Sequence, residues 1–269
     1  MNRLQNAISA LHEVDAEAGR RGAESKIHPA ARLFVCVLFI VLTVSFQRYD
    51  LWGLLAMSLY IIITGIWEDI SFRRGFGRLR VIFLFLLFLG IANPFLDREV
   101  ITHLGGLEIT GGMISMATLL IKGILTVYGA YFLLMTTGID GICLALRTFR
   151  VPAGGVTVIL LIYRYILLLL KEVQRMWQAY HMRAPKQRGI HISVWGSFAG
   201  LLLLRSMDRA NDVYHSMLLR GYDGASLSGF LQERDHFRKG RSIVYAAGWT
   251  AALFSLRMFP VFEAVGSLF

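Results

Sequence analysis

Long apolar segments separated by short polar connections dominate the sequence. Five of them have the apolar content and approximate length of helices that cross the hydrocarbon core of a membrane, which needs about 20 residues. These segments cover residues 30–46, 51–67, 79–95, 113–135 and 243–261. The pattern therefore predicts an all-α integral membrane protein with about five transmembrane helices and a cytoplasmic helical domain inserted before the last span.

A sixth apolar run, residues 156–170, is ambiguous because Arg164 stands at its centre. An arginine in the middle of a bilayer costs at least ~2.5 kcal/mol on insertion scales. If this run crossed the membrane, the basic segment that follows it, which includes Lys171 and Arg175, would be exported. We therefore expect the run to remain on the cytoplasmic side.

Lysine and arginine residues are distributed unevenly among the connections, and the positive-inside rule makes this a topology signal. The tail through Arg32 holds five of them, the connection between the second and third spans four, and the region between the fourth and fifth spans 15, so 24 of 28 lie inside when the N-terminus is cytoplasmic. The predicted domains are a cytoplasmic tail (1–29), four transmembrane helices (30–135), a cytoplasmic coupling domain (136–242) and the last transmembrane helix with the C-terminus (243–269).

Composition agrees with a membrane protein, because 55% of the 269 residues are hydrophobic and the mean hydropathy is +0.55. The net charge of +10 would suggest a nucleic-acid partner in a soluble protein, but here the location of the charge decides its meaning. The tail has no apolar region followed by a cleavage site, so we expect no signal peptide. Cys36 and Cys143 form neither a CxxC pair nor a disulfide framework.

Two amphipathic helices are predicted in the cytoplasmic domain, and each ends at an arginine. The first stops before Pro185, because the residue before a proline is driven out of the α region. The second ends at Gly221, a residue type favoured just after a helix C-terminus. Their apolar stripes are rich in methionine and aromatic residues, which suit surfaces that shift against each other or a partner, or that simply pack two helices together. The predicted interface residues are Met176, Tyr180, Met207, Tyr214 and Met217.

The two helix ends, AYHMRA at 179–184 and SMLLRG at 216–221, resemble the two Arg-Gly signatures of the transmembrane T component of energy-coupling-factor (ECF) transporters. The surrounding sequence resembles more narrowly the cobalt-type T proteins, the CbiQ family. The segments that carry this resemblance are LLLRSMDRANDVYHSMLLRGY, HPAARL, ANPF and LRTFRVP. The first signature departs from the family at Ala184, where glycine is usual.

This resemblance implies a non-catalytic coupling subunit of an ATP-driven importer in a bacterial or archaeal cell membrane. The implied partners are two ATP-binding cassette ATPase subunits and a substrate-binding membrane (S-type) subunit, with no nucleic acid. Arginine at a rigid helix end can bind carboxylates or carbonyls in a partner groove. The alternative from the residues alone is that both arginines are solvated. The implied ATPase-coupling residues are Arg183, Ala184, Arg220 and Gly221.

The expected cargo is cobalt, with nickel or a vitamin as alternatives, and this expectation rests on the resemblance.

No GxxxxGK[ST] motif occurs, so we expect ATP hydrolysis in partner subunits. The seven histidines form no HxxxH or HxH pair, so we expect no metal site, cofactor or catalytic residue in this chain. A self-sufficient secondary transporter would show internal repeats, and an intramembrane enzyme would show clustered acids or histidines; neither pattern is found. Lys122, in the fourth span, either pairs with carbonyls or reaches the interface.

Overall fold

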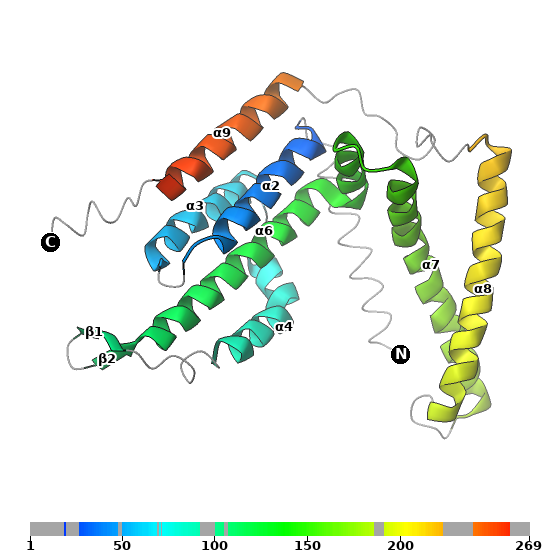
Figure 1. Cartoon of the computed structure of the whole chain (residues 1–269). Coiled ribbons are helices and arrows are strands. Elements are labelled where there is room, and N and C mark those ends of the chain that lie inside the picture. Colours follow the sequence, from blue (N-terminus) through cyan, green and yellow to red (C-terminus); the bar gives the residue numbers. More distant parts are fainter. Residues whose placement is uncertain are drawn as a thin grey trace. The chain divides into compact units, whose positions relative to one another are not determined.

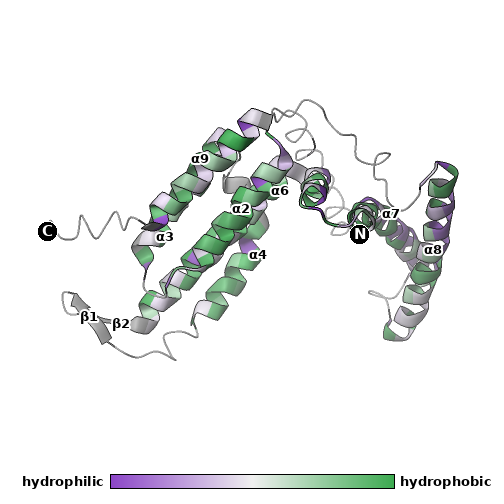
Figure 2. Cartoon of the chain, turned by 45° about the horizontal axis from the view of Figure 1, so that its top comes forward, coloured by the Kyte–Doolittle hydropathy of each residue, from purple (hydrophilic) through white to green (hydrophobic). Residues whose placement is uncertain are grey.

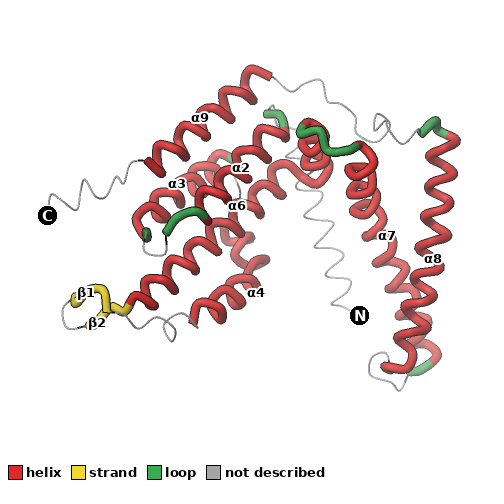
Figure 3. The backbone as a smooth tube through the Cα atoms, viewed as in Figure 1, coloured by secondary structure: helices red, strands yellow, loops and turns green. Residues whose placement is uncertain are grey.

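The computed structural model describes residues 19, 27–47, 50–68, 70, 72–91, 100–104, 107–185, 191–222 and 239–258. Most of the predicted tail, the ANPF motif at 92–95 and the last residues of the fifth predicted span lie outside the described residues. The predicted all-α membrane fold is confirmed, and a small antiparallel β-hairpin that sequence analysis missed precedes α6. The elements are α2 (Pro29–Val44), α3 (Leu51–Trp67), α4 (Phe72–Ile91), β1 (Val100–Leu104), β2 (Leu107–Thr110), α6 (Gly111–Thr148), α7 (Ala153–Arg183), α8 (Ile192–Leu219) and α9 (Lys239–Met258) (Figure 1, Figure 3).

The chain divides into two compact units. The bundle unit comprises Ala18–Gly138 and His236–Phe269, and the hairpin unit comprises Met1–Glu17 and Ile139–Asp235. The division falls within α6 at Gly138, whose φ of 68° and ψ of 169° interrupt the helix. Only glycine adopts these dihedrals readily, so this residue type permits the break. The assignment of residues 136–242 to a cytoplasmic coupling domain stays a prediction.

Contacts at both ends of α2 fix its direction relative to α9 within the bundle unit. The backbone N–H of His28, just before α2, donates to Ser242 Oγ near the start of α9 at 2.8 Å. At the other end, Arg257 Nη1 donates to the Leu42 carbonyl at 3.4 Å. The two helices therefore run parallel, and both begin on the same side of the bundle.

Aromatic packing joins α2, α3 and α9. The Phe39 ring stacks on Tyr60 with their centroids 4.4 Å apart, and Tyr60 meets Trp249 edge-on at 4.8 Å. Gly129 of α6 lies so close to α2 that a Cβ atom there would come within 3.1 Å of the Phe39 ring, and its carbonyl accepts from Cys36 Sγ at 3.4 Å. Many side chains on the outer faces of α2, α3 and α4 are apolar, as expected of helices that contact lipid (Figure 2).

Two of the described helices are long and apolar enough to cross a membrane, α6 over Gly112–Thr148 and α7 over Ala153–Arg183. The apolar helices over Pro29–Val44, Gly53–Trp67 and Leu79–Ile91 are shorter. α7 runs without interruption from the apolar segment 156–170 into the charged segment that ends at Arg183.

Lys122 lies beside the C-terminus of α2. Its Nζ donates to the Phe46 carbonyl at 2.5 Å and to the Val44 carbonyl at 3.4 Å, and the Arg257 guanidinium lies 5.3 Å from the centroid of the Phe46 ring. The last carbonyls of a helix have no intrahelical donor and carry partial negative charge, so cations are favourable there. Of the two alternatives for Lys122, the structure supports pairing with carbonyls.

Replacing Lys122 by methionine would keep most of the side-chain volume and remove the donor. The two carbonyls would lose a charged partner at a cost of about 1–3 kcal/mol. We expect the thermal unfolding midpoint in detergent to fall by about 5 °C. The matched control is Lys171→Met, which removes an exposed lysine of α7. Equal midpoints for the two variants would contradict the capping role.

Candidate functional site

α7 and α8 form an antiparallel helical hairpin (Figure 1). Glu172 of α7 forms an ion pair with Arg205 of α8 and a second, at 3.6 Å, with Arg175. The Tyr180 hydroxyl accepts a hydrogen bond from the backbone N–H of His191 at 3.4 Å. These contacts join the two helices near the middle of α8 and at the end where α7 stops and α8 begins.

A small core attaches the last part of α6 to the start of α7. Cys143 and Val156 are fully buried, and apolar side chains from both helices surround them. The turn between the helices contains Arg150 in the left-handed region, with φ of 63°, and the Val151 N–H donates to the Leu146 carbonyl at 3.1 Å. The LRTFRVP segment therefore forms a tight turn that fixes the N-terminal end of α7.

Arg220 is the C-cap residue of α8, and a Schellman motif fixes the backbone around it. The Gly221 N–H donates to the Leu218 carbonyl at 2.9 Å, and the Tyr222 N–H donates to the Met217 carbonyl at 3.0 Å. This pair of bonds requires a left-handed residue after the cap, and Gly221 supplies it with φ of 81°. The predicted role of Gly221 in ending the helix is confirmed, and the Arg220 side chain is exposed.

Arg183 is the last residue of α7, and its side chain is also exposed. Ala184 caps the helix with φ of −130°, and its N–H donates to the Tyr180 carbonyl at 2.9 Å. A negative φ does not require glycine, so alanine can replace the usual glycine of the family here. The two helix ends present their arginines through different caps.

The antiparallel arrangement places Arg183 and Arg220 at opposite ends of the hairpin (Figure 1). α8 has 28 residues, which corresponds to about 42 Å at 1.5 Å per residue. Two separate protein partners can therefore each reach one arginine. This spacing is the main geometric property of the candidate site.

The five predicted interface residues lie in different environments. Met176 and Met217 are buried, and Tyr180 is half-buried, whereas Met207 and Tyr214 are 56% and 53% exposed. The exposed pair is available to a partner. The role of these five residues in a moving contact stays a prediction.

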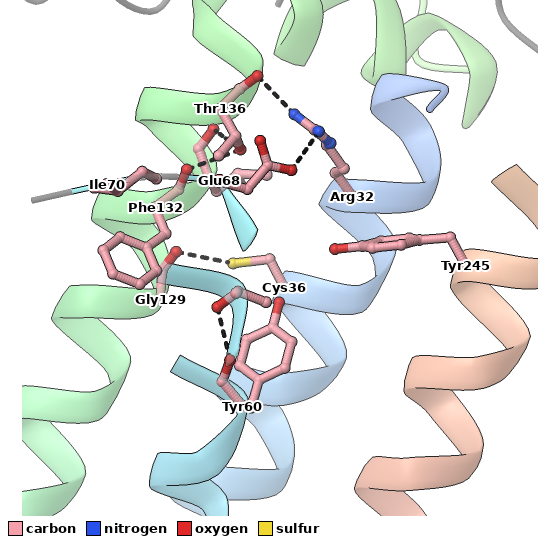
Figure 4. A pocket seen from close by; sticks show the side chains of 11 residues that line it. Arg32, Cys36, Tyr60, Glu68, Ile70, Gly129, Phe132, Thr136 and Tyr245 are labelled. Carbon is pink, nitrogen blue, oxygen red and sulfur yellow. Dashed lines mark hydrogen bonds and ion pairs between the residues drawn. The ribbon is translucent and has the colours of Figure 1, made fainter. Parts of the chain in front are cut away.

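A small cavity in the bundle unit is a second candidate site. Its volume is about 30 Å³ (Figure 4). A cavity of this size has room for one or two water molecules and is too small for an organic ligand. Among the described residues, no group of three or more His, Cys, Asp or Glu side chains is placed to hold a metal ion. The lining includes Arg32, Cys36, Tyr60, Glu68, Thr136 and Tyr245.

Comparison with known proteins identifies the family. Residues 22–229 match the CbiQ family, described as cobalt transport protein. The chain belongs to the CbiQ family. It is similar to the energy-coupling factor transporter transmembrane protein EcfT of Ruminiclostridium cellulolyticum, with 27% identity over 75% of this chain and 81% of that protein.

Two further relatives match shorter parts of the chain. An uncharacterized protein of Methanocaldococcus jannaschii is 30% identical over 42% of this chain and 39% of its own length. A Ycf92-like protein of Nostoc sp. is 30% identical over 46% of this chain and 44% of its own length. The family match includes both arginine helix ends. The chain is thus a transmembrane T component of the ECF type and of the CbiQ family.

The two caps lead to opposite expectations for glycine and alanine in this CbiQ protein. Gly221→Ala places an L-residue in the left-handed region at a cost of about 1–2 kcal/mol. We expect hydrogen-exchange protection in the last turn of α8 to fall about 5- to 30-fold. Ala184→Gly should change protection in the last turn of α7 by less than about threefold, because the backbone there is already compatible with either residue. Similar losses at both ends would contradict this assignment of the caps.

Proposed function

We propose that this CbiQ protein is the coupling subunit of an ATP-driven importer and transmits motion from two ATPase subunits to a substrate-binding membrane subunit. The observation that carries the proposal is the pair of exposed arginines at opposite ends of the α7–α8 hairpin. A guanidinium on a helix end presents a planar set of donors that can bind carboxylates or carbonyls in a partner groove. The negative end of the helix dipole also favours a cation at both positions.

Contacts within the hairpin unit connect both helix ends to α6, as a coupling role requires. The Glu172–Arg205 ion pair joins its two helices, and the core around Cys143 and Val156 attaches α7 to the last part of α6. A displacement of either arginine can therefore reach α6 through packed helices. In this proposal the chain itself is non-catalytic, and the ATPase subunits hydrolyse ATP.

The cargo that we propose is cobalt ion. Support comes from the family description, cobalt transport protein. The name of the EcfT relative specifies energy coupling and no cargo, so nickel and vitamin cargoes remain the alternatives. We assign recognition of the cargo to the substrate-binding subunit. Uptake of Co²⁺ and Ni²⁺ by the reconstituted complex, measured in parallel, tests the assignment.

The topology that we propose has five spans, formed by α2, α3, α4, the first part of α6, and α9, in a cell membrane of a bacterium or archaeon. Contacts within the bundle unit support it. Arg32 of α2 contacts Glu68 after α3 and Thr136 of α6, and α9 begins beside His28. The chain thus leaves the bundle and returns to it on the same side, so the intervening segment crosses the membrane an even number of times.

The even number of crossings argues against a membrane-spanning α7. If α7 crossed, α8 would have to cross back, although charged residues occupy the middle of α8. Each charge at the centre of a bilayer costs about 2.5–3.5 kcal/mol on insertion scales. We therefore place both helices, together with the N-terminus, on the cytoplasmic side. The charged residues in the middle of α8 are Arg205, Asp208, Arg209 and Asp212.

Charge reversal at the helix ends tests the proposed coupling role. Arg183→Glu and Arg220→Glu each place an anion where a partner would receive a cation, at a cost of about 2–5 kcal/mol per contact. In the double variant we expect co-purification of the ATPases and cargo uptake to fall at least tenfold, while the amount of inserted protein stays constant.

The matched control is Arg209→Glu, which reverses an exposed arginine of α8 away from either helix end. This variant should assemble and transport like the wild type. Wild-type assembly and uptake in the double variant would refute the coupling assignment.

A further inference from the structure

A buried arginine joins three helices of the bundle unit beside the break in α6 (Figure 4). Arg32 is 7% exposed. Its Nη1 donates to the Thr136 carbonyl of α6 at 2.7 Å, and its Nη2 forms an ion pair with Glu68 Oε1 at 2.5 Å. One guanidinium therefore connects α2, the residue after α3, and the end of the first α6 segment.

The Thr136 carbonyl has a structural reason to accept this bond. Thr136 lies two residues before Gly138, where the helical dihedrals end. Carbonyls in the last turn before a helix end lose their intrahelical donors and need others. Arg32 supplies such a donor from a neighbouring helix, and Glu68 fixes the plane of its guanidinium. Arg32 thus acts as a C-cap for the first α6 segment.

The cavity explains how so deeply buried a cation is accommodated. Glu68 neutralises the charge, but Arg32 Nε has no hydrogen-bond partner among the described residues. Arg32 lines the 30 Å³ cavity, and the Tyr245 hydroxyl points into the same region (Figure 4). Water in this cavity would accept from Nε, as buried water does for other polar groups that lack a protein partner.

We propose that Arg32 is the positioning residue of the joint at Gly138. It holds the last turn of the first α6 segment, so that displacement of the chain beyond Gly138 moves the bundle helices instead of swivelling about the glycine. The inference rests on the proposed function, because motion of the hairpin unit must then pass through α6. Arg32 makes its contacts within the bundle unit and acts through Thr136.

Two matched pairs of spin labels on α6 measure the stiffness of this joint. Ala130 and Arg147 flank Gly138, and Met113 and Ala130 lie at the same sequence separation within the first segment; all three positions are exposed. Each pair is replaced by cysteines in the full chain, which is co-purified with its ATPase partners. Double electron–electron resonance then gives both distance distributions. The native cysteines are buried, and labelling of the parent chain gives the background.

In Arg32→Gln we expect the 130–147 distribution to broaden about twofold while the 113–130 distribution keeps its width. Cargo uptake should fall at least tenfold with the ATPases still bound. Loss of a typical coupling free energy between two sites changes an equilibrium by about this factor. Arg32→Lys should have an intermediate effect, because an ammonium group keeps the charge and lacks the planar fork. If Arg32→Gln does not accumulate in the membrane, Arg32→Lys is judged by the same two distributions.

An unchanged 130–147 distribution would overturn the proposal, because the joint would not depend on Arg32. Equal broadening of both pairs would also overturn it, because Arg32 would then only stabilise the bundle. Failure of the proposed function has a separate signature. In that case the wild-type chain would neither bind ATPases nor support uptake, although the Arg32 variants, spin-labelled in the chain alone, would still alter the 130–147 distribution.

Discussion

Lipid offers no hydrogen bonds, so every polar group inside a membrane bundle has to find its partner within the protein. The bundle unit satisfies this constraint at the places where its helices end or break. Lys122 and Arg257 contact carbonyls at the C-terminus of α2, and Arg32 contacts a carbonyl just before the break in α6. These three cations are therefore placed where helix ends need donors.

Charged side chains of the hairpin unit have different surroundings. The arginines at the ends of α7 and α8 are exposed, and the ion pair between Glu172 and Arg205 lies between the helices. The cations named in the bundle unit thus satisfy helix ends, whereas the hairpin unit presents two cationic tips. The break at Gly138 lies where the two units meet along the chain.

Sequence periodicity predicted the helices well, because the apolar runs are long and each is bounded by charged or turn-forming residues. It ended the fourth span at residue 135, but it did not predict that α6 continues as a helix to Thr148 beyond a break at Gly138. It also missed the contact between Arg32 and Glu68, which lie 36 positions apart in the sequence. Similarly, periodicity identified the apolar faces of α7 and α8 but not their register. The Glu172–Arg205 ion pair sets that register and places Met176 opposite the first half of α8, far along the helix from Tyr214.

In the proposed assembly, one hairpin contacts two ATPases through its opposite ends. The most direct measurement is photo-cross-linking of the assembled complex, with a photoreactive amino acid in place of Arg183, Arg220 or, as control, Arg209. We expect cross-links to an ATPase subunit from both ends and none from position 209. With probes at both ends, we expect a species that contains one copy of this chain and two ATPase subunits. Cross-links from neither end, or equally strong cross-links from position 209, would contradict the proposed assembly.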